Sequence, residues 1–245
     1  MSQTISILQW NIWYKEDIHN VAAFLKMHPT DIICLQELTI QDMSETGHTP
    51  DYIAKELGYY HFYKEIDLDE GKIPLANGIF SKYPIVNTNW RWINEAGGTG
   101  HYDDENRAYI EATINVSGEH VTVATTHMSY TGAFVSTSRK QEETQKLVDI
   151  LKAKHSRFIF TGDLNATPDS PTIQVVSSVL KNIGPDFNQK TWATKPFSYD
   201  GFEETDLNWR LDYIFATPDI KTISAEVLKT EYSDHLPIRA VISTA

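Results

Sequence analysis

The segment Phe158–Pro171 reads FIFTGDLNATPDSP and changes from apolar to polar in its middle. Its first three residues are apolar and suit a buried strand. If strand geometry continues through Leu164, alternation places Asp163 and Asn165 on the same side of the strand. Two interpretations follow from this segment alone. It is either an ordinary turn, because Gly-Asp and Asn-Ala-Thr favour turns, or a polar pair that closes a strand at an active site.

The composition predicts an ordinary globular protein. The chain has 245 residues, of which 41% are hydrophobic and 22% charged, and this length suffices to bury about 70% of the unfolded surface. No shift in composition, linker or repeat divides the sequence, so we expect one domain, residues 1–245. Cys34 is the only cysteine and lies in an apolar run. An internal disulfide is therefore impossible, and a buried thiol is expected.

The N-terminal residues MSQTISILQWN lack the basic region and the long apolar region of a signal peptide. No later run approaches the length of a transmembrane helix, so we expect a cytoplasmic protein without membrane insertion. The formal net charge of −12 argues against broad contact with nucleic-acid phosphates. It is compatible with a local phosphate site, because a bound cation partly cancels clustered carboxylates. We infer no obligate protein partner and expect a monomer.

Two predicted strands near the N-terminus lead into polar side chains. Ile5–Trp10 alternates like a strand and is followed by Asn11. Asp31–Gln36 is a continuous apolar run, typical of a strand covered on both faces, and it is expected to end at Glu37. Both strands thus lead into a side chain with an oxygen that can bind a metal.

The middle of the chain predicts a hairpin followed by a helix. Its two strands are Arg107–Val116 and Glu119–His127, so the second strand ends on His127. The amphipathic segment from about Thr137 to Lys154 is expected to form the helix. We expect its charged side chains to form a solvated face, made of Arg139, Lys140, Lys146, Lys152 and Lys154.

The last third adds two more polar positions. The strand predicted at Arg210–Phe215 carries Asp212 among apolar neighbours, where an unpaired carboxylate is unfavourable, so Asp212 should have a partner. Asp234 and His235 directly precede the predicted closing strand, Ile238–Ile242. They extend the pattern of reactive side chains next to strands.

Strand ends of a layered sheet can gather at one edge, and this set of residues is rich in hard oxygen donors. Such donors favour Mg²⁺ or Mn²⁺ over zinc. The chemistry indicated is phosphate ester hydrolysis, in which a metal and an imidazolium neutralise developing charge and a carboxylate positions water. The set consists of Asn11, Glu37, His127, Asp163, Asn165, Asp212, Asp234 and His235.

Six segments, LQWN, LQE, TTH, TGDLNATPDS, LDYIF and SDHLPI, occur in this order between Leu8 and Pro237. Together they resemble the endonuclease/exonuclease/phosphatase superfamily of DNase I-like metal-dependent phosphoesterases. The resemblance implies an α/β fold, a four-layered α/β sandwich in which two mixed β-sheets pack face to face with helices on the outside. It also implies a metal-dependent hydrolase acting on ester bonds.

The same resemblance implies roles for the polar set. Glu37 would bind Mg²⁺, with Mn²⁺ as an alternative, and Asn11 and Asp234 would assist it. Asp163 would orient or deprotonate the attacking water, and Asn165 would help to hold the phosphoryl group.

The two histidines take further roles under the resemblance. His235 would contact a non-bridging phosphate oxygen, and Asp212 would fix its ring. His127 matches a second histidine that contacts phosphate or assists the leaving group. Arg107 is either a further phosphate contact or a structural arginine. Aromatic side chains that could stack on a substrate, or simply pack in loops, are Trp13, Tyr130 and Trp209.

We therefore expect a Mg²⁺-dependent phosphoesterase that hydrolyses a phosphodiester by metal-assisted in-line attack of water. One form of this hypothesis is a nuclease or phosphodiesterase that processes DNA or RNA ends. The alternative is a phosphatase or phospholipase C-type hydrolase of sugar-phosphate or phospholipid substrates. A hypothesis of another class is a non-catalytic binding module with the same fold.

Overall fold

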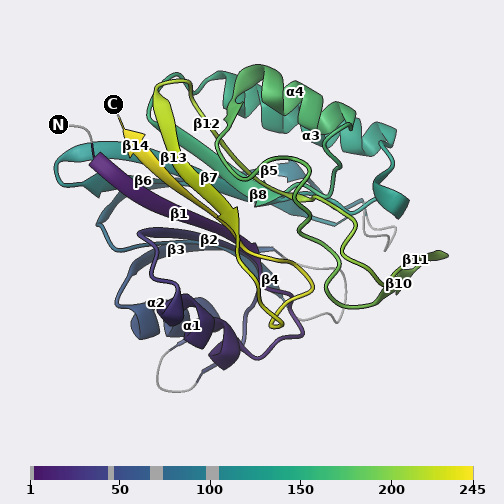
Figure 1. Cartoon of the computed structure of the whole chain (residues 1–245), viewed down its shortest axis with the longest axis horizontal. Helices are drawn as coiled ribbons and strands as arrows, with labels where there is room; N and C mark the ends of the chain where they lie inside the picture. Colours follow the sequence, from purple (N-terminus) through teal and green to yellow (C-terminus); the bar gives the residue numbers. More distant parts are fainter. Residues whose placement is uncertain (1–2, 44–46, 67–73, 98–104, 245) are drawn as a thin grey trace.

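A computed structural model describes residues 3–43, 47–66, 74–97 and 105–244 of the chain (Figure 1). The first large sheet has the strand order β13-β14-β1-β2-β4-β3. Its strands are β1 (Gln3–Asn11), β2 (Ile32–Thr39), β3 (Tyr60–Ile66), β4 (Leu75–Ser81), β13 (Ile220–Val227) and β14 (Ile238–Thr244).

The second large sheet has the order β5-β6-β7-β8-β12-β9. Its strands are β5 (Ile85–Asn94), β6 (Arg107–Val116), β7 (Glu119–His127), β8 (Phe158–Asp163), β9 (Lys181–Asn182) and β12 (Asp212–Ala216). A separate hairpin pairs β10 (Phe197–Tyr199) with β11 (Phe202–Glu204). The helices are α1 (Ile18–Met27), α2 (Thr49–Leu57), α3 (Ser138–Lys152), α4 (Pro171–Val179) and a short 3₁₀ helix, Gly132–Phe134.

Both large sheets are mixed. β1 pairs in parallel with β2 and antiparallel with β14. In the second sheet β7 is parallel to β8, and β12 is antiparallel to β8. The parallel pairs bring the C-terminal ends of β1 and β2 together, and likewise those of β7 and β8.

Alternation along the strands produces the layers. On β1, Ile5 and Ile7 face a core that lies between the two sheets, whereas Leu8 and Trp10 face α1 and α2. Aliphatic side chains from both sheets fill the central core, and aromatic residues such as Phe160 pack beneath α3 and α4. Figure 1 shows α1 and α2 outside one sheet and α3 and α4 outside the other. The predicted four-layered sandwich is confirmed.

Local sequence signals account for the helix ends. Asp17, Thr137 and Ser170 each accept a hydrogen bond from a backbone amide in the first turn of α1, α3 and α4. Gly58 ends α2 with φ 69°, a conformation that glycine adopts without strain.

Two features of the fold differ from the sequence-based predictions. Lys140, expected on the solvated face of α3, is 2% exposed and points into the protein. β13 and the β10–β11 hairpin were not predicted, because their apolar residues are few and β13 is largely exposed. The sequence Asn94–Asn106, with three glycines, predicts an irregular surface loop, and its positions 98–104 lie outside the described residues. No helix within the described ranges is both long enough and apolar enough to cross a membrane.

Candidate active site

A buried polar layer closes one end of the space between the two sheets. On β8 the inward-facing positions change from Ile159 to Thr161 and then Asp163, all 1% exposed or less. β1 and β7 change in the same way and end at Asn11 and His127, which are also buried. The parallel strand pairs therefore deliver polar groups to the same edge of the sandwich.

Glu37 reaches this edge through a bulge rather than from a strand end. β2 continues to Thr39, so the predicted end of the strand at Glu37 was wrong. The pairing of β2 with β4 shifts register between Leu35 and Leu38, and Glu37 has φ 59°. An extra residue in the left-handed conformation rotates its side chain out of the regular alternation. Leu38 then takes the helix-facing position that Glu37 would otherwise occupy.

Asn11 links two of the carboxylates. Its Nδ2 donates to Oε1 of Glu37 at 2.9 Å and to Oδ2 of Asp163 at 3.0 Å. Its Oδ1 accepts from the amide of Trp13 at 3.1 Å, and the next amide, that of Tyr14, donates to Oε2 of Glu37 at 3.1 Å. In this arrangement Asn11 orients the carboxylates, and its own oxygen is engaged by the backbone.

Asp212, His235 and Asp163 form a buried row. Oδ2 of Asp212 lies 2.9 Å from Nδ1 of His235, and Nε2 of the same ring lies 3.5 Å from Oδ2 of Asp163. Asp212 is paired directly opposite Asp163 across β12 and β8. The buried Asp212 therefore has the partner that its apolar surroundings required.

The neighbouring charges and burial shift the pKa values of His235 and Asp163. Burial by itself would lower the pKa of His235, but Asp212, Asp163 and Asp234 outweigh it and raise that pKa to about 10. Burial raises the pKa of Asp163 to about 6, with Asp212 adding to the rise and His235 opposing it. At neutral pH the ring is a cation and Asp163 is a carboxylate that can still accept a proton.

His127 and Asn165 form the opposite side of Asp163. Nε2 of His127 lies 3.1 Å from Nδ2 of Asn165 and 3.5 Å from Oδ2 of Asp163. Asn165 has φ 44°, and its backbone amide donates to Oδ1 of Asp163 at 2.9 Å. Burial lowers the pKa of His127 well below its ordinary value, helped by the positive charges of Arg107, His235 and Lys140. His127 is therefore neutral where His235 is charged.

Ser233 and Trp192 hold the segment that carries Asp234. The hydroxyl of Ser233 donates to the backbone oxygen of Asn11 at 2.7 Å and accepts from the amide of His235 at 2.9 Å. The indole of Trp192 donates to Oδ2 of Asp234 at 3.1 Å. Burial raises the pKa of Asp234 to about 6 against the pull of His235, and Glu37 raises it further.

The donors at this edge fit a hard divalent cation. Burial raises the pKa of Glu37 too, and the charge of Asp163 adds to the rise. A bound divalent cation would offset this repulsion between carboxylates. Asp163, Asp212 and His235 offer ligand atoms within 4.8 Å of one another. Glu37 and Asp234, whose charges interact at this edge, add further carboxylate oxygens of the kind that such a cation prefers.

Arg107 does not join the carboxylates in this structure. Alternation along β6 puts it on the face of Tyr109, which packs in the core beneath α3. Its guanidinium forms a buried ion pair with Glu105 at 2.7 Å. Its positive charge nevertheless acts on the site, because it helps to lower the pKa of His127.

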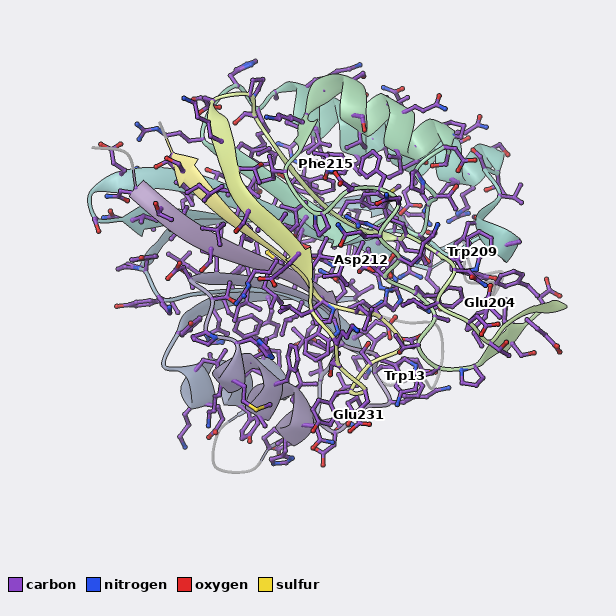
Figure 2. The ribbon with its side chains drawn as sticks, viewed as in Figure 1. Trp13, Glu204, Trp209, Asp212, Phe215 and Glu231 are labelled. Atoms are coloured by element: carbon purple, nitrogen blue, oxygen red, sulfur yellow. The ribbon has the colours of Figure 1, made fainter. Side chains whose placement is uncertain are left out.

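The three aromatic candidates lie near the same end of the molecule but in different settings. Trp13, which has φ 59°, is half-buried, and the ammonium groups of Lys15 and Lys195 lie 5.6 and 6.0 Å from its ring centre. Tyr130 and Trp209 pack with Phe134 in a separate aromatic cluster. Trp209 also donates to Glu204 at 2.6 Å. Figure 2 shows Trp209 next to Glu204, the last residue of β11, with Trp13 toward the same end and Asp212 in the interior.

Sequence reasoning missed the polar residues that support the site. Gln9 and Gln36 pair through their side-chain amides, and Gln36 also donates to Thr125 at 2.8 Å. Nε2 of Gln9 lies 3.4 Å from Oδ1 of Asp212. The available signal was spacing, because Gln9 lies two residues before Asn11 and so shares its face of β1.

Solved structures share this fold at low sequence identity. An endonuclease/exonuclease/phosphatase from Beutenbergia cavernae matches with a TM-score of 0.75 and 21% identity over 99% of this chain and 72% of its own. A mannosyl-6-phosphatase from Bacteroides thetaiotaomicron gives 0.69 and 17% over 97% and 99%. D. rerio TDP2 complexed with a single-strand DNA product gives 0.69 and 18% over 98% and 99%.

No curated protein sequence matches this chain significantly. The model of the endonuclease/exonuclease/phosphatase family matches residues 8–235, which include every predicted site residue. The chain belongs to the endonuclease/exonuclease/phosphatase family, whose members are phosphoesterases.

Proposed function

We propose that this chain is a Mg²⁺-dependent phosphoesterase that cleaves a phosphodiester by attack of water. The observation that carries the proposal is the buried row in which His235 lies between Asp212 and Asp163. It puts a carboxylate that can accept a proton next to an imidazolium that can face a phosphate oxygen.

Asp163 is proposed as the general base. A pKa of about 6 leaves it ionised at neutral pH and still basic enough to take a proton from water. The water oxygen would form a bond to phosphorus while the bond to the leaving oxygen breaks, and one water proton would pass to Asp163. Asn165 and the neutral His127, in contact at 3.1 Å, would hold oxygens of the phosphoryl group.

His235 is proposed to stabilise negative charge on a non-bridging oxygen. Its pKa of about 10 keeps it cationic at neutral pH, and a preorganised cation in a buried site stabilises developing charge more than one in water. Asp212 holds Nδ1 and thereby keeps Nε2 directed toward Asp163.

Glu37 and Asp234 are proposed to hold Mg²⁺, with Mn²⁺ as an alternative, and Asn11 would fix the orientation of Glu37. The bound ion would supply Lewis-acid stabilisation of the phosphoryl oxygens. The raised pKa values of both carboxylates support this assignment, because a divalent cation would relieve their repulsion.

The substrate class is proposed to be a phosphodiester such as a DNA or RNA end. D. rerio TDP2, a structure of similar fold, is complexed with a single-strand DNA product, which supports this choice. A sugar phosphate is the second candidate, because another protein of similar fold is a mannosyl-6-phosphatase. The net charge of −12 weighs against long duplexes in either case.

A substrate panel tests the proposal. Purified protein with Mg²⁺ is incubated in parallel with single-stranded DNA, duplex DNA, a sugar phosphate, inositol phosphates and sphingomyelin. We expect cleavage of single-stranded DNA, and loss of that activity by about 100-fold or more in Asp163→Ala and His235→Ala. Asp169→Asn is the matched control, since this exposed carboxylate lies six positions after Asp163. Cleavage of the sugar phosphate alone would select the second candidate, and inactivity on all five would refute the proposal for these classes.

We also propose that residues 1–245 form one domain that works as a cytoplasmic monomer. The central core supports the single domain, because it draws side chains from both sheets and from Ile5 through Ile242.

A further inference from the structure

Helix α3 carries two charged residues that face into the protein. Lys140 is 2% exposed and Glu143 is 1% exposed, whereas Lys146 on the same helix is exposed. A buried ammonium is unfavourable unless it is paired and hydrogen-bonded. The hydrogen bonds of the Lys140 ammonium therefore indicate the role of this residue.

Lys140 joins the two loops that leave β7 and β8. Its Nζ donates to the backbone oxygen of Ser129 at 2.7 Å and to that of Leu164 at 2.8 Å. Ser129 lies two residues after His127, and Leu164 lies between Asp163 and Asn165. One ammonium thus contacts both segments that supply the phosphate-facing side of the site.

Glu143 holds the first of these loops from its other side. The amide of Ser129 donates to the carboxylate of Glu143 at 3.1 and 3.3 Å. Both backbone polar groups of Ser129 are therefore bound by α3. The helix is in turn fixed to α4 by a contact of 2.8 Å between the hydroxyls of Thr144 and Thr172.

The separation of these two loops sets the contacts that the side chain of Asn165 makes. Nδ2 of Asn165 donates to the backbone oxygen of Met128 at 2.9 Å and lies 3.1 Å from Nε2 of His127. These contacts require the two loops to keep a fixed separation. The two carbonyls that accept from Lys140 belong to Ser129 and Leu164, which are the chain neighbours of Met128 and Asn165. The backbone amide of Met128 also donates to the backbone oxygen of Asp163 at 2.9 Å, so the pairing of β7 with β8 fixes the two segments up to these residues. Lys140 fixes the next carbonyl of each segment, beyond the last bond of that pairing.

We propose that Lys140, assisted by Glu143, is a positioning residue that clamps the Met128–Ser129 and Leu164–Asn165 segments so that His127 and Asn165 hold the phosphoryl group together. The inference rests on the proposed function for its effect on rate. Its effect on the geometry of His127 and Asn165 does not depend on that function.

The kinetic test replaces Lys140 with residues of similar length. Lys140→Met removes the charge and the donors, and we expect kcat to fall about tenfold or more while KM and the Mg²⁺ concentration for half-maximal rate change by less than about twofold. Lys140→Arg keeps a donating cation and should recover part of the loss. Lys146→Met, the exposed control, should match the wild-type protein.

The structural test uses NMR in the absence of substrate. In Lys140→Met we expect the imidazole resonances of His127 and the side-chain amide resonances of Asn165 to shift, while those of His235, held by Asp212, stay in place. Should Lys140→Met fail to fold, Glu143→Gln serves as the second variant. It keeps the size of the side chain and one acceptor for Ser129, and we expect the same resonances to move by a smaller amount.

The two measurements separate the two proposals. An inactive wild-type protein whose His127 and Asn165 resonances respond to Lys140→Met would refute the proposed function and leave the clamp standing. An active wild-type protein with unchanged kcat and unchanged resonances in Lys140→Met would refute the clamp alone. A fall in kcat without movement of these resonances would also contradict positioning.

Discussion

Nδ1 of His235 lies 2.9 Å from Oδ2 of Asp212, and both side chains are buried. The two residues are brought together by strands of different sheets, because Asp212 begins β12 and His235 lies three residues before the start of β14. The contact therefore depends on how the two sheets pack against each other. It also fixes which ring nitrogen of His235 faces Asp163.

Removing the charge behind His235 should impair the reaction without unfolding the protein. In Asp212→Asn the ring loses its ionic partner, and we expect kcat to fall by about 10- to 100-fold, the usual range for residues that orient a catalytic group. Steady-state kinetics with a phosphodiester substrate measures this effect. Asp149→Asn, an exposed carboxylate on α3, is the control. Wild-type kcat in Asp212→Asn would show that the ring needs no such partner.

Cys34 should be unreactive in the folded protein. Burial raises the pKa of its thiol to about 12, and the side chain is 0% exposed. Because the thiolate is the reactive form, a water-soluble thiol reagent should modify no more than traces of native protein and one thiol per chain in denaturant. Stoichiometric modification under native conditions at neutral pH would contradict the buried position.

Lys140 should make stability depend on pH in the alkaline range. Burial lowers its pKa from 10.5 to about 8, although Glu143 and Asp163 oppose the change. Between these values the unfolded chain binds more protons than the folded protein, so the free energy of unfolding should rise with pH. We therefore expect wild type to gain stability relative to Lys140→Met from pH 8 to 10, measured by urea unfolding. A constant or shrinking difference would contradict the lowered pKa.

Asp31 should make stability depend on pH in the acid range. Burial alone would raise its pKa, but hydrogen bonds from Ser6 and the ammonium of Lys82 lower it overall. A lowered carboxyl pKa stabilises the protein above the ordinary value of 3.8, and this stabilisation disappears as pH falls through the folded-state pKa. We expect Asp31→Ala to cost about 2 kcal/mol of unfolding free energy at pH 7 and less at pH 3. An equal cost at both pH values would contradict the assignment, and Glu142→Gln is the exposed control.

The fold was predictable from the sequence because its signals are local. Alternation along Ile5–Trp10, the apolar run before Glu37 and the Ser117-Gly118 hairpin each depend on neighbouring residues only. The two halves of that hairpin, Arg107–Val116 and Glu119–His127, match β6 and β7. The resemblance to a known family then supplied how the strands are layered.

What the sequence could not provide depends on contacts between distant segments. Lys140 lies seven residues before Leu147, on the buried face of α3, so helical spacing places it inward and only its charge suggested a solvated position. It is buried because its ammonium donates to the carbonyls of Ser129 and Leu164. Glu37 was expected at a strand end, but a bulge against β4 carries it into the site. The sequence alone showed that Asp212 needs a partner, because a carboxylate among apolar neighbours is unfavourable when unpaired. The family resemblance identified that partner as His235.

Asp163, His235 and the carboxylates around them are proposed to hydrolyse phosphate esters with a bound divalent cation. The most direct measurement is the rate of phosphodiester cleavage after EDTA treatment and on addition of Mg²⁺, in wild type and in Asp163→Asn. We predict that EDTA abolishes the wild-type rate, that Mg²⁺ restores it, and that Asp163→Asn stays about 100-fold or more below it at any Mg²⁺ concentration. Undiminished cleavage in EDTA, or a wild-type rate in Asp163→Asn, would contradict this account.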